Sequence, residues 1–537
     1  MTQAWTATGA ARALRDGTAT SVGLTKAALA AADEADRRLG IYLARFDERA
    51  LEAAERADEE LARGIDRGPL HGIPIGVKDT IAAADGPTTG QSLVLDPAWG
   101  AGRDATVVAR LRAGGAVVTG KTTAMEFGCG LPDAAKPFPF PRNPWQPELW
   151  AGGSSSGTAS GVAAGTFLAG LGSDTGGSIR MPAAFCGVSG LMPTFGRVPE
   201  AGCLPLGYSL DRVGPLARSA RDCSAVLSVI ADVPYTEPRF DGDLSGMRVG
   251  VVREHHFPED GDPALPEAFD TAVSVLAGLG ATPVDVTLPY WWELIASMFV
   301  TATSEGLAFH GADLPRRWDD YFTASRGLLA MGALVSGAEY VQAQRVRRVA
   351  QEAVDALFGE VDVIVCPTAS VGAPPFGDLA NAAGHQDNAG LFAKIYTPYW
   401  NPLANPVLAV PMGFTASGLP LSMQIAGPVW GEAAVLGVGD AYQRRTGWHS
   451  RVPVPARTDA RHDGRPRPPE REDPAVTARV RTLLDAARLP ADEREIAGLS
   501  ASYAATRPVV DGLFDIPAAR HARPVLTRHV PDPEVSA

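Results

Sequence analysis

The chain has 537 residues, 45% of them hydrophobic, and a formal net charge of −13. This is the composition of a globular protein long enough for more than one domain, and the negative charge argues against a nucleic-acid partner. The five cysteines form no C-x-x-C pair, so we expect reduced thiols, no metal site and a cytoplasmic protein. We find no signal-peptide pattern, and no apolar stretch reaches the roughly eighteen residues of a membrane span, so we expect no contact with a membrane.

The N-terminal part of the chain predicts helices followed by short strands. Small apolar residues recur at helical spacing within residues 1–70. A short apolar run predicts a strand over 73–78. Residues 105–112 predict a helix that ends at Gly114-Gly115, and a strand over 116–119 should follow it.

The middle of the chain changes in character twice. Residues 131–152 are rich in Pro and Trp and lack periodicity, which indicates an ordered loop. Residues 152–190 are dominated by small residues, with Gly/Ser turns around a predicted helix over 160–170. Strands and helices then alternate, which predicts an α/β fold with helices on both faces of a sheet. These later segments are strands over 247–252, 361–366 and 407–410 and a helix over 268–279.

The C-terminal part of the chain predicts a small separate unit. A Pro- and Arg-rich stretch over 457–474 has the composition of a linker, which places the main domain at 1–456 and a helical tail at 475–537. Apolar residues at helical spacing predict one amphipathic helix that stops at Pro490 and a second over 492–506. Two short helices bury little area alone, so we expect the tail to dock on the main domain or on a partner.

Two familiar motifs occur outside their usual context. Residues 115–122 match the Walker A pattern, but strand-forming residues stand where a phosphate loop must curl. Residues 153–157 match the G-x-S-x-G elbow of α/β-hydrolases, but a loop precedes them where that elbow needs a strand. We therefore expect neither nucleotide binding nor a nucleophile elbow.

The block from Gly152 to Arg180 has the composition of a catalytic loop. Gly176 and Gly177 precede Ser178 and let consecutive N–H groups point into one concavity, which beside a nucleophile is an oxyanion hole. A serine hydroxyl is a weak nucleophile and needs a base. None of the nine histidines lies in this block, although a Ser–His–Asp triad assembled through space stays open.

Lys78 is the alternative base. Only five of the 48 basic residues are lysines, and an ammonium, unlike a guanidinium, can lose its proton. Lys78 ends the predicted strand over 73–78, and a lysine there can point into the interior, where desolvation lowers its pKa. Taken alone, a lysine at the end of a strand is more often an ion-pair partner than a base.

Taken together, these segments closely resemble the amidase signature family. The resemblance rests on Gly72-Ile-Pro-Ile-Gly-Val-Lys-Asp79, Gly120-Lys-Thr122, Arg142-Asn-Pro-Trp145 and the Gly152–Arg180 block. It is dense over 71–215 and covers roughly 5–450. It implies a central mixed, twisted sheet covered by helices on both faces, and a hydrolase that cleaves a C–N bond through an acyl-serine intermediate.

The resemblance also implies a Ser–cisSer–Lys triad. Ser178 occupies the position of the nucleophile, and Lys78 occupies that of the base. Ser154 occupies the position of the bridging serine, which in this family follows a cis peptide bond. No metal and no organic cofactor are implied.

The residues around this triad have family counterparts as well. The N–H groups that match the oxyanion loop are those of Thr175, Gly176, Gly177 and Ser178. Ser155 is the neighbouring serine that usually binds the lysine, and Asp174 and Arg180 are expected to brace the loop as an ion pair. One departure is Ala404, where the family often has glycine, and it puts the backbone near the acyl pocket in doubt.

Three functions follow from these residues. The first is an amidohydrolase that releases ammonia or an amine from a small amide or urea-type molecule. The second is the glutaminase subunit of a tRNA-dependent amidotransferase, which would need a tRNA-handling partner. The third is a scaffold that kept the fold without catalysis. The sequence leaves the substrate undefined, and a homo-oligomer such as a homodimer stays open.

The tail contains Leu489-Pro-Ala-Asp-Glu-Arg494, Phe514-Asp-Ile-Pro517 and Arg523-Pro524. With these segments it loosely resembles two small partner proteins. One is the C subunit of those amidotransferases, and the other is the short subunit that accompanies 1-carboxybiuret hydrolases. In both, a polar helix pair precedes an extended segment that contains proline. This resemblance predicts a fusion of an amidase with its own partner.

Overall fold

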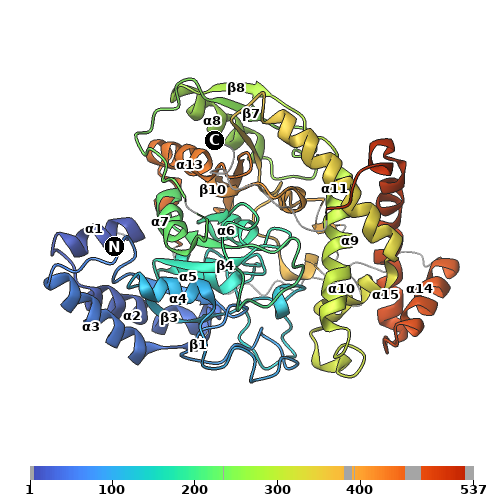
Figure 1. Ribbon diagram of the computed structural model, residues 1–537, viewed down its shortest axis with the longest axis horizontal. Helices are drawn as coiled ribbons and strands as arrows, with labels where there is room; N and C mark the ends of the chain where they lie inside the picture. The colour runs from blue at the N-terminus through green and yellow to red at the C-terminus, as the bar shows by residue number, and fades with distance from the viewer. Residues whose placement is uncertain (1–4, 234, 380–389, 392, 454–472, 526–537) are drawn as a thin grey trace.

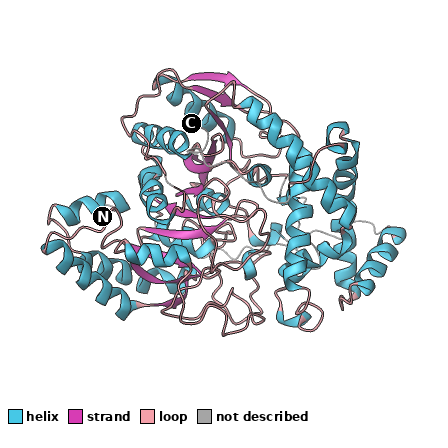
Figure 2. Cartoon of the chain, in the orientation of Figure 1, coloured by secondary structure: helices cyan, strands magenta, loops and turns pink. Residues whose placement is uncertain are grey.

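A computed structural model of the chain describes residues 5–233, 235–379, 390–391, 393–453 and 473–525 (Figure 1). Most of the predicted linker over 457–474 and the last residues of the tail lie outside this part of the chain. Helices surround a central sheet in both ribbon views (Figures 1 and 2).

The sheet has eleven strands in the order β1-β3-β2-β4-β6-β5-β10-β11-β9-β7-β8. The strands are β1 (Tyr42–Arg45), β2 (Pro74–Lys78), β3 (Val117–Thr122), β4 (Ala169–Ser173), β5 (Ser189–Met192), β6 (Val213–Ala217), β7 (Arg248–Val251), β8 (Thr282–Asp285), β9 (Val363–Pro367), β10 (Val407–Phe414) and β11 (Pro420–Ala426). β2 is parallel to β3 and β4, and β7 is parallel to β8 and β9, whereas the remaining pairs are antiparallel. The sheet is therefore mixed, as predicted.

Helices cover both faces of this sheet because the strands are apolar on both sides. Val363 and Val365 belong to one buried cluster, and Ile364 and Cys366 between them belong to another. The first face packs against α1 (Ala7–Arg15), α4 (Thr106–Ala113), α7 (Ala220–Ile230), α8 (Leu265–Gly278) and α13 (Glu432–Thr446). The second packs mainly against α2 (Ser21–Leu39), α5 (Ser156–Ala164), α6 (Arg180–Cys186), α9 (Trp291–His310) and α11 (Gly337–Leu357).

Two further helices belong to the main domain: α3 (Asp47–Ala62) lies on β3, and α10 (Thr323–Met331) lies beside α9. The helix predicted over 160–170 is present, but its bounds are wrong, because α5 spans Ser156–Ala164. The helix α5 ends at Ala164 because Gly165 has a left-handed backbone with φ of 76°, which suits glycine at a helix C-terminus. The chain then enters β4.

The tail forms two helices, α14 (Pro474–Ala486) and α15 (Glu493–Gly512), and it docks on the main domain (Figure 1). α15 runs past the predicted end at 506, through Pro508. A helix-breaking residue is tolerated there because the following turn is held by tertiary packing: Val510 is buried against Ala296 and Val300 of α9.

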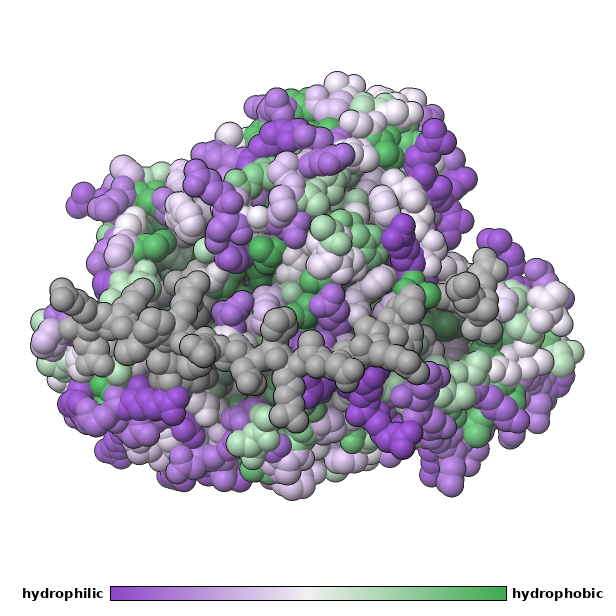
Figure 3. Space-filling view, turned by 180° about the vertical axis from the view of Figure 1, so that it is seen from behind, coloured by the Kyte–Doolittle hydropathy of each residue, from purple (hydrophilic) through white to green (hydrophobic). Residues whose placement is uncertain are grey.

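The described surface mixes polar and apolar residues. On the face drawn in Figure 3, hydrophilic and hydrophobic residues are interspersed over the described part of the surface. Among the described residues, no helix is both long and apolar enough to cross a membrane.

The docked tail gives a stability prediction. Leu499 of α15 is 1% exposed within an apolar cluster that joins tail and main domain, so Leu499→Ala should lower the free energy of unfolding by about 2–5 kcal/mol. Thermal denaturation measures this. Leu93→Ala is the matched control because Leu93 is 42% exposed, and it should change the Tm little. Equal Tm values for the Leu499→Ala variant and the wild type would contradict the docking of the tail.

Candidate active site

The candidate residues come together because two neighbouring parallel strands end at one edge of the sheet. β2 ends at Lys78, and β4 ends at Ser173 just before the glycine-rich loop. The two strands pair in parallel, with Val77 opposite Leu171. Their C-terminal ends therefore bring Lys78 beside the loop that carries Ser178.

Lys78 is fully buried and its amine is bound by hydroxyl groups. The Nζ atom lies 2.7 Å from Ser154 Oγ and 2.9 Å from Ser173 Oγ. Burial lowers the pKa of Lys78 to about 7, although the negative charges of Asp174 and Asp211 act in the opposite direction. A substantial fraction of the amine is therefore neutral at physiological pH.

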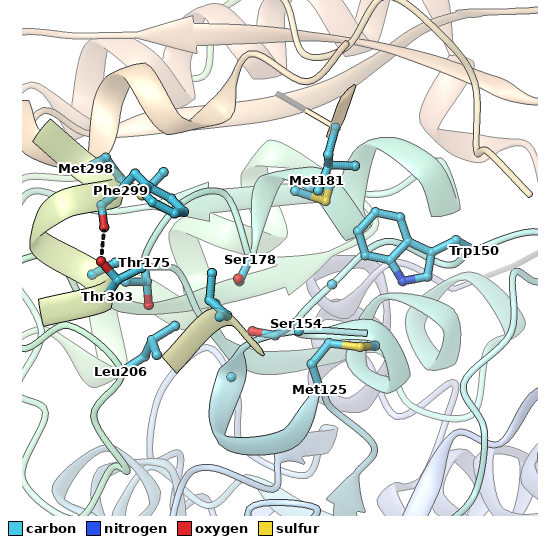
Figure 4. A pocket seen from close by; sticks show the side chains of 17 residues that line it. Met125, Trp150, Ser154, Thr175, Ser178, Met181, Leu206, Met298, Phe299 and Thr303 are labelled. Carbon is cyan, nitrogen blue, oxygen red and sulfur yellow. Dashed lines mark hydrogen bonds between the residues drawn. The ribbon is translucent and has the colours of Figure 1, made fainter. Parts of the chain in front are cut away.

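Ser154 and Ser178 line the same pocket from different elements. Ser154 precedes α5 and follows a cis peptide bond with Gly153, whereas Ser178 lies between β4 and α6. Figure 4 shows both side chains at the centre of the pocket. The amine of Lys78 is therefore bonded to Ser154, and Ser154 lines the same pocket as Ser178.

Three of the four predicted oxyanion N–H groups are available. The amides of Thr175, Gly176 and Ser178 belong to residues that line the pocket, and none of them has a partner among the hydrogen bonds of the described residues. The amide of Gly177 instead donates to Asp174 Oδ1 at 2.7 Å. Gly177 is therefore a structural part of the loop, while the other three amides can receive an oxyanion.

Asp174 and Arg180 form the predicted ion pair. Arg180 Nε lies 3.0 Å from Asp174 Oδ2, and both side chains are fully buried. Burial alone would raise the pKa of Asp174, but the charge of Arg180 and several hydrogen bonds outweigh it and lower the pKa to about 2. Arg180 also donates to the Thr397 carbonyl, the Asn401 side chain and the Gln424 side chain. The pair fixes the loop to β11 and to the segment before β10.

Ser155 has a different partner from the one that the family resemblance implies. Its Oγ donates to the backbone carbonyl of Ser173 at 3.2 Å, and none of the hydrogen bonds between Lys78 and the described residues involves it. The hydroxyl that binds Lys78 besides Ser154 is that of Ser173. The sequence analysis missed Ser173, although its position at the end of the strand beside Lys78 was a usable signal.

Asp211 is a second residue that sequence reasoning missed. Its carboxylate accepts a short hydrogen bond from the Thr175 hydroxyl and also binds the amides of Leu206 and Gly207. Burial raises the pKa of Asp211. Through these bonds Asp211 ties the loop of the candidate oxyanion hole to the pocket wall at Leu206.

The pocket is small and its walls are apolar. It has a volume of about 80 Å³, and none of its described lining residues is charged. Met298, Phe299 and Thr303 of α9 lie on one side and Trp150 and Met181 on the other (Figure 4). The remaining lining residues are Met125, Gly128, Gly130, Gly153, Leu206, Ala302, Leu328 and Leu391 together with Ser154, Thr175, Gly176 and Ser178.

The structure argues against a histidine base and against a phosphate loop. His71 is buried beside Glu60, with 3.0 Å between Nε2 and the carboxylate, and no described residue of the pocket lining is a histidine. The Walker-like segment forms the buried strand β3. Its Lys121 pairs with Asp79 at 2.8 Å, so that lysine is an ion-pair partner within the sheet.

The chain matches the Amidase family over residues 23–436. It therefore belongs to the amidase signature family and is a hydrolase that acts on C–N bonds. The glutamyl-tRNA(Gln) amidotransferase A subunit from Chloroflexus aurantiacus is 38% identical over 484 residues, which cover 83% of this chain and 98% of that protein.

Solved structures support the same fold. A protein of a vestigial complex, which reveals the evolutionary origins of an s-triazine catabolic enzyme, aligns with a TM-score of 0.75 and 31% identity, over 82% of this chain and 99% of that one. The peptide amidase of Stenotrophomonas maltophilia aligns with a TM-score of 0.69 and 29% identity, over 85% and 99% of the two chains. These relatives have different names and activities, so the likeness defines the fold and reaction class but not the substrate.

The loop geometry gives a prediction for Gly177. A Cβ atom at this position would lie 1.9 Å from Thr397 Oγ1, and the φ of 127° strains any other residue. Gly177→Ala should therefore displace the loop and lower kcat by at least about a hundredfold. Gly278→Ala is the control, because no atom lies within 4 Å of its added Cβ. Full activity of the Gly177→Ala enzyme would show that the loop is not part of the site.

Proposed function

We propose that the protein hydrolyses small, uncharged amides with apolar acyl groups through an acyl-Ser178 intermediate. One observation carries this proposal. The amine of Lys78, whose pKa is lowered by burial, is hydrogen-bonded to Ser154, and Ser154 lines an apolar pocket together with Ser178. A urea-type substrate of similar size and charge belongs to the same class.

The proposed reaction begins with the neutral amine of Lys78. Ser154 passes its proton to Nζ and takes the proton of Ser178, whose Oγ attacks the carbonyl carbon. The amides of Thr175, Gly176 and Ser178 stabilise the oxyanion. When the C–N bond breaks, Ser154 gives a proton to the leaving nitrogen and takes one back from the Lys78 ammonium, and ammonia or an amine departs. Water then attacks the acyl-enzyme by the same proton path and releases the acid.

In this mechanism Ser173 orients the neutral amine of Lys78. Such an amine has two N–H bonds and one lone pair, and the lone pair must point at Ser154 to accept its proton. Nζ lies 2.9 Å from Ser173 Oγ and 3.5 Å from the Ser173 carbonyl oxygen. Ser173 can therefore receive the N–H groups and direct the lone pair toward Ser154, which makes it a positioning residue.

The walls of the pocket support an uncharged acyl group. An ammonium or carboxylate enclosed there would lose its hydration and meet no opposite charge among the described lining residues, at a cost of several kcal/mol. Free glutamine carries both groups. The pocket therefore disfavours the glutaminase alternative, although the relative from Chloroflexus aurantiacus belongs to an amidotransferase.

A non-catalytic scaffold is the least supported alternative. Burial of the Lys78 amine without a carboxylate bonded to it destabilises the folded state, because desolvation of an ammonium is unfavourable. A protein that used the fold only as a surface would gain nothing from this arrangement.

The proposal predicts the outcome of a substrate panel. Ammonia release should be fast with acetamide or butyramide and at least about a hundredfold slower, in kcat/KM, with free glutamine, because its charges stay unpaired in the pocket. Ser178→Ala should lower kcat by several orders of magnitude. Ser228→Ala, at an exposed position of α7, should be fully active. A preference for glutamine would favour the glutaminase of an amidotransferase instead.

The pH dependence tests the base. Because Lys78 must be neutral, kcat/KM should rise with pH and level off above a pKa of about 7. Lys78→Arg should be as inactive as Lys78→Ala, since a guanidinium stays protonated. A histidine has a similar pKa, so His71→Ala is the necessary control and should be active. Loss of activity in His71→Ala as complete as in Lys78→Ala would replace this mechanism with a Ser–His mechanism.

A further inference from the structure

The C-terminal helices cover the two helices that form one wall of the pocket. α9 contributes Met298, Phe299, Ala302 and Thr303 to that wall, and α10 contributes Leu328. Figure 1 shows α15 alongside α9 and α10, and residue contacts join α15 to both. The family match ends at residue 436, so this cover lies outside the part of the chain that matches the family.

A continuous apolar cluster joins the tail to the pocket. It contains Phe299 and Leu206, which line the pocket, and it extends to Leu499 and Ile496 of α15. Its other tail members are Val480, Leu484, Leu489 and Tyr503. Because a buried cluster is close-packed, a shift of α15 changes the space available to the side chains on its far side.

A second group of contacts holds the neighbouring face of α9. Ala296 and Val300 pack against Val510 and Leu513 of the tail. They lie on α9 at positions that interleave with Met298 and Ala302, and one rigid helix carries both sets. The tail contact and the pocket wall therefore move together.

A buried carboxylate fixes the tail to α10. Glu495 of α15 is 5% exposed. It accepts hydrogen bonds from Arg326 Nε at 2.7 Å and from Trp318 Nε1 at 3.1 Å. It also accepts the amide of Asp492 at 3.0 Å, as part of a capping box. Arg326 is two residues from Leu328 on the same helix, so this bond acts directly on the wall.

The tail is also bound to α11 beyond α9. Arg507 of α15 forms an ion pair with Glu339, and Gln342 donates to the Leu513 carbonyl at 2.8 Å. The tail is thus bonded to α10 and to α11, and we expect these bonds to hold α9 in place.

We infer that the C-terminal helices α14 and α15 are a specificity-determining element that holds α9 and α10 in place as the wall of the acyl pocket. This inference rests on the proposed function, in which that pocket receives the acyl group of the amide. A longer acyl chain reaches the wall, whereas the shortest chain stays beside Ser178. Loosening the tail should therefore weaken binding of the longer amide selectively.

The test compares Glu495→Gln with Glu493→Gln in the full-length protein. The carboxylate of Glu495 accepts hydrogen bonds from three donors, whereas the side-chain amide in Glu495→Gln has only one acceptor oxygen. Glu493 lies in the same first turn of α15 but forms only an exposed ion pair with Arg481 of α14. The two variants remove the same charge from the first turn of α15, but only Glu495→Gln weakens the bonds to Arg326 of α10 and to Trp318.

Two measurements decide the outcome. The first is kcat/KM for butyramide relative to acetamide. In Glu495→Gln this ratio should fall by about tenfold, mainly through KM, because two methylene contacts are weakened. The second is amide hydrogen exchange in α9 and α10 below the unfolding temperature, which should become faster. Glu493→Gln should match the wild type in both.

Either of two results would overturn the inference. One is unchanged exchange in α9 and α10 of Glu495→Gln. The other is faster exchange with the same butyramide-to-acetamide ratio, which would make the tail a stabilising element only. Failure of the proposed function is visible separately, because the wild type would then hydrolyse neither amide while the exchange measurement still reported on the wall.

Discussion

The site depends on one unfavourable burial, that of the Lys78 amine without a carboxylate bonded to it. The chain contains a direct comparison: Lys121 is also fully buried, but it lies 2.8 Å from Asp79. Lys78 instead meets the hydroxyls of Ser154 and Ser173. Hydroxyl groups can bind the amine in either protonation state, whereas a bonded carboxylate would hold it as an ammonium. The strand pair β2 and β4 therefore has to supply the packing that keeps water away.

The carboxylates of Asp174 and Asp211, whose charges act on this amine, are hydrogen-bonded to other groups. Asp174 is surrounded by donors from Arg180, Asn401 and Gly177, and Asp211 is bound by the Thr175 hydroxyl and two amides. Their negative charge still raises the proton affinity of Lys78 from a distance, but their geometry serves the loop. These bonds fix the loop whose Thr175, Gly176 and Ser178 line the pocket.

The sequence predicted the mixed α/β fold, and its motifs predicted which residues would meet at the sheet edge. It succeeded where the signal is local: glycines before Ser178, and a lysine at the end of an apolar strand. It failed once on a local signal, because Gly165 ends the helix predicted at 160–170 early. It failed elsewhere because the cause is tertiary: α15 continues through Pro508 because Val510 is buried. The pocket wall comes from α9, which carries no motif, so its apolar character could not be assigned to a site before the fold was known.

The ties of Arg180 have a consequence for the order in which the protein matures during synthesis. Its partners Thr397, Asn401 and Gln424 follow it by 217, 221 and 244 residues. Until those residues have left the ribosome, the guanidinium has no permanent acceptors beyond Asp174, and the loop that it braces is incomplete. At an elongation rate of about 5–20 residues per second, a nascent chain spends roughly ten to fifty seconds with its serine loop synthesised but unsupported. The serine loop is therefore made early, and its bracing is completed only when the segment before β10 and the strand β11 have been synthesised.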